Sequence, residues 1–233
     1  MKPIINKEIQ YYLNNPIGYI ILALFGIFIN FLFVKDLFVN GAFSLQTFFA
    51  LIPWIYLIFI PALGMRIFSE EKRLNTLEVL LALPVSETQI VLAKFFSLVF
   101  LVCISLVLTL SIPVSVNLIS HLYLPEVVVG YCGAVLIGGA FISLTMLFSV
   151  RTKNQIVAFL LSVLTIFVLM GLSSDLLATI LPKSIQDILI FFGPLNHYQN
   201  FAKGILDVRS IFYFVCIIVL SLFATIIDLE KRS

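Results

Sequence analysis

Charged residues are scarce in this chain. Asp, Glu, Lys and Arg make up 11% of its 233 residues, whereas hydrophobic residues make up 61%. Soluble domains usually carry about 25% charged residues, which cover a surface that faces water. The deficit excludes an ordinary soluble domain, and the 23 phenylalanines fit helices that face lipid. The composition therefore predicts an integral membrane protein.

Cysteine and histidine are rare and form no recognisable site. Cys103, Cys132 and Cys216 lie in apolar runs without C-x-x-C spacing, which favours small packing residues over a metal or redox centre. His121 and His197 lie in different predicted outer loops, where a single histidine is usually solvated. The sequence has no H-E-x-x-H motif, and no Ser–His–Asp set or aspartate pair can be placed in a span. We expect no catalytic residue, no bound cofactor and no metal in this chain.

An energy source within the chain is missing as well. There is no G-x-x-x-x-G-K-[ST] loop to cradle nucleotide phosphates. Ion-coupled carriers usually need ionisable groups inside their spans, and the apolar runs hold essentially none; Asp175 lies nearest. Backbone groups at broken helices can also bind ions. We expect energy for transport to come from another protein.

Long apolar runs are abundant. A helix needs about 20 residues to cross a bilayer, and six runs predict an all-α membrane protein with spans at 17–34, 47–68, 94–118, 127–150, 155–177 and 211–228. Prolines within or near these runs predict kinks rather than breaks, at Pro53, Pro61 and Pro113. Small residues in the fourth run would allow close approach of a helix from this chain or from a second subunit, at Gly130, Gly133, Gly138 and Gly139. No internal repeat divides residues 1–233, which we treat as one domain.

Shorter segments flank these spans. Residues 1–15 have apolar positions at helical spacing and predict an amphipathic helix in the membrane interface. No cleavage site follows the first run, so it should remain as an anchor. In the outer loop 182–210, short helical pieces at 184–192 and 195–206 flank Gly193-Pro194 and suggest a partly re-entrant helical hairpin. The alternative is a simple connecting loop.

Lys and Arg set the expected orientation, because they concentrate in cytoplasmic loops. Ten of the 14 fall on one side if the N-terminus is cytoplasmic: Lys2, Lys7, Arg66, Lys72, Arg73, Lys94, Arg151, Lys153, Lys231 and Arg232. The other four are Lys35, Lys183, Lys203 and Arg209. Both termini and the polar stretch after the second run are therefore predicted to be cytoplasmic.

That polar stretch, residues 66–84, is the longest interruption between apolar runs. Ser69 can cap a helix, with negative charge in its first turn. One stripe of the predicted helix is apolar, at Leu74, Leu77, Leu80 and Leu81. Pro84 ends the helix, and Ser86 begins the next one. The helix is either a solvated interfacial helix or a ledge that presents charges to a cytoplasmic partner.

A family resemblance favours the ledge. Residues 66–86 read R-I-F-S-E-E-K-R-L-N-T-L-E-V-L-L-A-L-P-V-S, followed by I-V-L-A-K-F at 90–95. This resembles the signature of ABC-2 type transporter permeases, with Asn75 at a position where the family often has Gly. The N-terminal helix, six spans and bulky last outer loop extend the resemblance over the whole chain. Within the family the chain is most similar to the compact subgroup that includes gliding-motility and nitrous-oxide-reductase maturation permeases, and residues 193–207 are similar to the last outer loop of that subgroup.

The resemblance implies a non-catalytic half-transporter in a bacterial plasma (inner) membrane. Such permeases form homo- or heterodimers and bind separate ATP-binding cassette subunits, which hold ATP and Mg²⁺. The helix over 69–84 would be the coupling element, and closure of the ATPase subunits would pull on it and on residues 1–15 to open an outward path. We predict that it docks the ATPase through Glu70, Glu71, Lys72, Arg73, Thr76, Glu78 and Pro84. No nucleic-acid partner is expected.

Two other functions stay open at this point. A carrier or channel without an ATPase would transport in liposomes without ATP. A membrane scaffold would couple ATP hydrolysis to assembly of surface machinery, such as that for gliding motility. An adjacent gene for an ATP-binding cassette subunit would exclude the first alternative but not the second.

Overall fold

The computed structural model describes residues 1–40, 45–81, 84–119, 123–172 and 191–231, and every regular element within them is a helix. The helices are α1 (Lys2–Asn14), α2 (Pro16–Asn40), α3 (Leu45–Gly64), α4 (Arg66–Arg73), α5 (Leu77–Leu81), α6 (Glu87–Val107), α7 (Ser111–Ile119), α8 (Leu124–Arg151), α9 (Gln155–Gly171), α12 (Pro194–Ala202) and α13 (Val208–Glu230). The all-α prediction is confirmed for this part of the chain.

Five helical segments among the described residues are long and apolar enough to cross a membrane: Gly18–Lys35, Leu45–Arg73, Glu87–Leu118, Leu124–Arg151 and Val208–Glu230. They correspond to five of the six predicted spans. The remaining prediction, 155–177, begins as α9, an apolar helix of 17 residues. Its continuation lies outside the described residues, so the sixth span stays a prediction.

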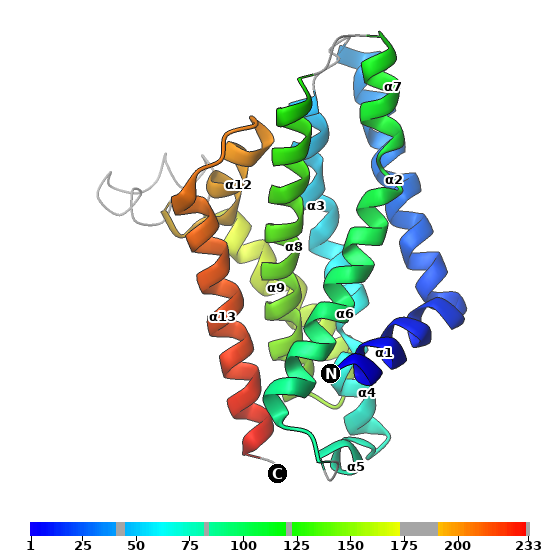
Figure 1. Cartoon of the computed structure of the whole chain (residues 1–233), viewed down its shortest axis with the longest axis vertical. Coiled ribbons are helices and arrows are strands. Elements are labelled where there is room, and N and C mark those ends of the chain that lie inside the picture. The colour runs from blue at the N-terminus through cyan, green and yellow to red at the C-terminus, as the bar shows by residue number, and fades with distance from the viewer. Residues whose placement is uncertain (41–44, 82–83, 120–122, 173–190, 232–233) are drawn as a thin grey trace.

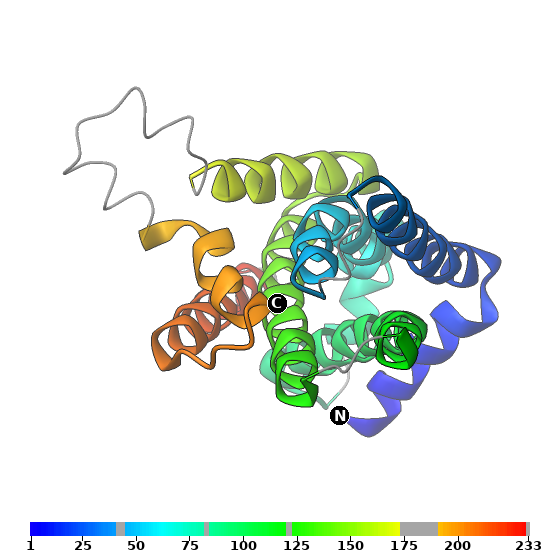
Figure 2. The ribbon, with the colours of Figure 1, turned by 90° about the horizontal axis from the view of Figure 1, so that it is seen from above.

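Helix α8 lies at the centre of the bundle (Figure 1). It packs against α3, α6, α9 and α13, and also against the short helices α4 and α12. Seen from above, α9 and α13 flank α8, while α1 lies on the other side of the bundle beside α2 and α6 (Figure 2). We call the two ends of the bundle the α5 end, where the chain's C-terminus also lies, and the α7 end (Figure 1).

Glycines on α8 make this central position possible. A Cβ atom at Gly133 would lie 2.4 Å from Cβ of Phe201 on α12, and one at Gly130 would lie 2.4 Å from the ring of Phe49 on α3. Gly138 and Gly139 face α3, α6 and α13 in the same way, at distances of 3.2 Å or more. All four glycines are buried, and side chains from other helices of this chain pack against them. Their packing here is therefore between helices of one subunit.

The prolines behave differently from one another. Pro53 and Pro61 lie inside α3, which continues past both, so neither proline breaks the helix. The third predicted span is instead interrupted by a turn at residues 108–110, between α6 and α7. Pro113 has no N–H to offer the carbonyl of Thr109, which explains why the helix stops one turn earlier. The hydroxyl of Thr109 donates to the carbonyl of Leu106 at 2.6 Å within this turn.

The described part of the predicted outer loop packs into the bundle. Tyr198 and Phe201 on α12 are buried, and the Tyr198 hydroxyl donates to the carbonyl of Phe49 at 3.0 Å. Helix α12 ends at Ala202 rather than near residue 206, because Gly204 follows in the left-handed conformation with φ of 75°. The first predicted piece, 184–192, lies mostly outside the described residues.

Candidate functional site

The polar stretch after α3 forms two short helices where one was predicted. Helix α4 ends at Arg73 and α5 begins at Leu77, because Asn75 adopts a left-handed conformation with φ of 54°. Asparagine tolerates this conformation better than other non-glycine residues. Of the predicted apolar stripe, Leu77 is buried, whereas Leu74 is 59% exposed. The chain therefore turns at Asn75, and this turn connects α4 to α5.

The N-terminus of α4 is capped by another helix. The first four N–H groups of a helix lack partners within it, and the residue preceding α4, Met65, supplies no side-chain acceptor. Instead, Oγ of Ser149 on α8 accepts from the N–H groups of Phe68 and Ser69 at 3.1 Å and donates to the carbonyl of Met65 at 2.8 Å. The prediction that Ser69 caps the helix is wrong, because its hydroxyl donates back to the Met65 carbonyl at 2.5 Å.

The ammonium group of Lys94 joins α6 to α1 and α4. Its Nζ lies 2.8 Å from Oε1 of Glu8 and 2.9 Å from Oε1 of Glu71, and it donates to the carbonyl of Ile67 at 2.8 Å. The residue is 1% exposed. Three acceptors match the three protons of an ammonium group, and such pairing is what allows a charge to be buried. The prediction of essentially no buried charge in the spans is therefore wrong at Lys94.

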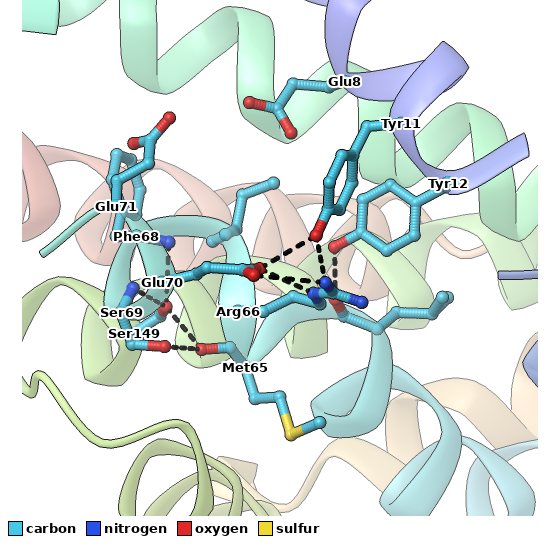
Figure 3. Close-up of polar contacts among 12 residues, drawn as sticks. Glu8, Tyr11, Tyr12, Met65, Arg66, Phe68, Ser69, Glu70, Glu71 and Ser149 are labelled. Carbon is cyan, nitrogen blue, oxygen red and sulfur yellow. Dashed lines mark hydrogen bonds and ion pairs between the residues drawn. The ribbon is translucent and has the colours of Figure 1, made fainter. Parts of the chain in front are cut away.

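A second set of contacts joins α4 to α1 (Figure 3). Nε of Arg66 lies 2.9 Å from Oε2 of Glu70, and the Tyr11 hydroxyl donates to the same oxygen at 3.1 Å. The Arg66 guanidinium also donates to that hydroxyl and lies over the Tyr11 ring, 4.8 Å from its centroid. Beside it, the Tyr12 hydroxyl donates to the carbonyl of Leu63 at 2.6 Å. Burial raises the pKa of Tyr12, so this phenol remains a neutral donor.

A cleft of about 370 Å³ lies between α1, α4 and α5. Its lining combines charged groups of α1 and α4 with apolar side chains near α5, among them Val79, which is 67% exposed. Glu71 also lines the cleft. Its Oε2 atom is buried and has no hydrogen-bond partner among the described residues. The α5 end therefore offers a partly apolar recess and one unsatisfied acceptor.

The predicted docking residues divide into two sets. Glu70 and Glu71 are half-buried and engaged with Arg66, Tyr11 and Lys94, as described above, and Lys72 is buried. The exposed set comprises Arg73, Thr76, Glu78 and Pro84. The structure thus places the first set inside the junction, our name for the contacts that join α4 to α1, α6 and α8, and leaves the second set open to contact from outside the chain.

Six further residues of the junction were not singled out as site residues from the sequence: Glu8, Tyr11, Tyr12, Arg66, Lys94 and Ser149. Two signals were available. Lys94 is the single cation of the apolar helix α6, at its eighth position, and Arg66 stands four residues before Glu70, the spacing of a helical ion pair. Nothing in the sequence marks Ser149, because its role depends on where α8 crosses α4.

The described residues contain no group of three or more His, Cys, Asp and Glu side chains that could hold a metal ion. Cys103, Cys132 and Cys216 are free thiols.

Comparison with known proteins gives one family. The model of the ABC-2 family transporter protein matches residues 3–229. No curated protein matches this chain.

Proposed function

The chain belongs to the ABC-2 transporter family, and we propose that it is the membrane-spanning permease subunit of an ATP-driven exporter. In this proposal it pairs with a second copy or a paralogue and binds separate ATP-binding cassette subunits, which hold ATP and Mg²⁺ and hydrolyse the nucleotide. As part of this proposal, we assign it near the gliding-motility and nitrous-oxide-reductase maturation permeases, because residues 193–207 resemble the last outer loop of that subgroup.

We take the α5 end as cytoplasmic, in a bacterial plasma membrane. Two features support this orientation. The polar helices α4 and α5 lie at this end together with the C-terminus (Figure 1). Arg66, Lys72, Arg73 and Lys94 belong to the same region, which follows the tendency of cytoplasmic segments to carry Lys and Arg. Helix α1 would then lie in the cytoplasmic interface.

The observation that carries the proposal is the attachment of α4 to three other helices. Ser149 bonds it to α8, Lys94 bonds it to α6 and α1, and Tyr11 bonds it to α1 again. A displacement of α4 would therefore be shared by the first helix, the third span and the central helix of the bundle. ATPase subunits that contact α4 and α5 differently before and after ATP binding could supply that displacement.

The two sets of predicted docking residues would have different roles. Glu70 and Glu71 hold α4 to its neighbours within the chain. The exposed Arg73 and Glu78 are free to form ion pairs with an ATPase, with Thr76 and Pro84 beside them. The cleft between α1, α4 and α5 would accept a side chain of the ATPase, and the unsatisfied oxygen of Glu71 would accept a hydrogen bond from it.

Charge reversal tests the docking role. The variants Arg73→Glu and Glu78→Lys should reduce co-purification of the ATPase and abolish ATP-driven transport, at an unchanged unfolding temperature because both side chains are exposed. Lys35→Glu, an exposed change at the far end of α2, is the matched control. If both docking variants retain full ATPase binding and transport, the docking role is refuted.

The same preparation separates the alternative functions. Transport by wild-type chain in liposomes without ATP would identify an ATPase-independent carrier or channel. ATP hydrolysis that couples to assembly of surface machinery, with no solute moved, would identify a scaffold. Either outcome would overturn the exporter proposal.

A further inference from the structure

A second cleft, of about 330 Å³, lies between α3 and α12, towards the α7 end of the bundle (Figure 1). We call it the α3–α12 cleft. One wall includes Gln46, Ala50 and Trp54, which follow one another along α3 at intervals of four residues and therefore share a face of that helix. The opposite wall includes Gln199, in the last turn of α12, and Lys203, the residue that follows the helix.

A proline and a tyrosine hold the two walls together. Pro53 has no N–H, so it leaves the carbonyl of Phe49 without the donor that a helix normally supplies four residues later. The hydroxyl of Tyr198 on α12 donates to this carbonyl at 3.0 Å, and Tyr198 is buried. The α3–α12 cleft is therefore bounded by two helices that are fixed to each other.

Most polar side chains of the cleft have no bonding partner. Apart from Tyr198, four side chains of the lining can donate hydrogen bonds: Gln46, Trp54, Gln199 and Lys203. None of these four is hydrogen-bonded or ion-paired to another of the residues that the structure describes. The described lining contains no Asp or Glu. Lysine and tryptophan side chains only donate, so the cleft suits a negatively charged ligand that is rich in acceptors.

The ammonium group of Lys203 is not needed to cap α12. Lysine side chains near a helix C-terminus often bond the last carbonyl groups. Here the backbone does so, because the N–H groups of residues 203–205 donate to the carbonyls of residues 199–201 at 2.9 to 3.2 Å. The Lys203 side chain is exposed and remains available to a ligand. Glu126 on α8 lies beside Gly204 but does not line the cleft.

The wall on α3 changes from polar to apolar along the helix. Gln46 is the second residue of the candidate span Leu45–Arg73 and is exposed. Trp54 lies about 12 Å further along the axis, and Ile58 continues the same face about 6 Å beyond it. These two side chains are 53% and 61% exposed. Tryptophan favours the boundary between lipid headgroups and hydrocarbon, so this face passes from the headgroup region into the membrane interior.

We propose that the α3–α12 cleft binds a phospholipid whose headgroup carries a net negative charge. The phosphate accepts hydrogen bonds from Lys203, Gln46 and Gln199, and an acyl chain lies along Trp54 and Ile58. A charged phosphate matches the unpaired donors, and a soluble phosphate would leave the apolar part of the face without a partner. The site depends neither on transport nor on which end of the bundle is cytoplasmic. With the orientation proposed above, the lipid belongs to the outer leaflet.

Fluorescence of Trp54 tests the site directly, because it is the single tryptophan of the chain. The full chain is reconstituted in mixed vesicles of phosphatidylcholine and phosphatidylglycerol. In one set the phosphatidylglycerol carries dibrominated acyl chains, which quench tryptophan on contact, and in a second set an equal amount of phosphatidylcholine carries them. We expect phosphatidylglycerol to bind beside Trp54 about fivefold more strongly, the effect of one lysine on an anionic lipid.

Substitutions assign this preference to the cleft. Lys203→Gln should bring the ratio of the two binding constants to about one, whereas Lys203→Arg should keep the preference, because arginine also bonds phosphate. Both changes are at an exposed side chain and should leave the fold intact. Arg209→Gln is the matched control. It removes an exposed cation at the start of α13 that does not line the cleft, and the preference should remain.

Four outcomes would overturn the proposal. Equal quenching by the two lipids in the wild-type chain would show that the cleft does not select an anionic headgroup. A preference that persists in Lys203→Gln would place its cause elsewhere. A change in Trp54 emission with millimolar inorganic phosphate, together with equal quenching by the lipids, would identify a site for soluble phosphate. Absence of quenching by either lipid would show that protein, such as a second copy of this chain, covers the cleft.

Discussion

Replacing Lys94 by Met removes the buried charge while keeping a side chain of similar volume. Lys94 is 1% exposed and forms ion pairs with Glu8 at 2.8 Å and with Glu71 at 2.9 Å. Its removal leaves two carboxylates in a largely buried site without their cation. Breaking a buried ion pair by removing one partner costs about 3–5 kcal/mol. At about 2–4 °C per kcal/mol for a chain of this size, the unfolding temperature should fall by about 6–20 °C.

A triple variant separates stability from transmission of force. Lys94→Met combined with Glu8→Gln and Glu71→Gln removes all three charges, and neutral replacement of a buried ion pair is often neutral for stability. We expect it to unfold within a few degrees of wild type and to bind the ATPase through the exposed residues of α4 and α5. Transport should still be lost, because α4 is no longer bonded to α1 and α6 by this contact.

The assays are thermal unfolding in detergent, co-purification of the ATPase and ATP-driven transport, each with Lys153→Met as an exposed control expected to lie within about 0.5 kcal/mol of wild type. A Lys94→Met chain as stable as wild type would refute the assignment of Lys94 as a required cation. A stable triple variant with full transport would refute its role in coupling.

Three further substitutions test the packing and the caps. Ser149→Ala should destabilise the chain by about 1–3 kcal/mol, because two N–H groups of α4 lose their acceptor, whereas Ser162→Ala, which loses only a bond within its own helix, should be near neutral in the same melting assay. Gly133→Ala should destabilise the chain by about 1–3 kcal/mol, because its Cβ would lie 2.4 Å from the nearest side-chain atom. The control Gly171→Ala should cost nothing, because nothing lies within 4 Å of its Cβ. Equal melting temperatures of the two variants would contradict this. Asn75→Val should cost about 1–2 kcal/mol through its left-handed backbone and Asn75→Gly should not, and loss of stability in the glycine variant alone would refute the conformational reasoning.

The spans were predictable because the length of an apolar run can be read from the local sequence alone. The runs at 127–150 and 211–228 fall within α8 and α13, and the cap at Ser86 accepts from the N–H of Gln89 as its spacing indicates. The break at Asn75 was less visible. Asparagine only permits the left-handed conformation, and the leucine pattern continues through it as though the helix were unbroken.

The junction at α4 was predicted in position but not in composition. The charges at Glu70 and Glu71 were assigned to an external partner, since a sequence shows charge but not what lies across from it. Their contacts with Tyr11 and Lys94 join residues 59 and 23 positions apart, and such pairings depend on how the spans pack. The four glycines of α8 posed the same difficulty. Small residues allow another helix to approach closely, but the sequence does not show which helix it is.

The cap that Ser149 places on α4 engages only main-chain atoms: two N–H groups and one carbonyl. No side chain of α4 takes part, so this attachment does not depend on which exposed side chains that helix carries. Over evolutionary time, the outward side chains at Arg73, Thr76 and Glu78 are therefore free to diverge while α4 keeps its position on α8. One bundle can in this way be adapted to a new partner by a few surface exchanges, with its interior left unaltered.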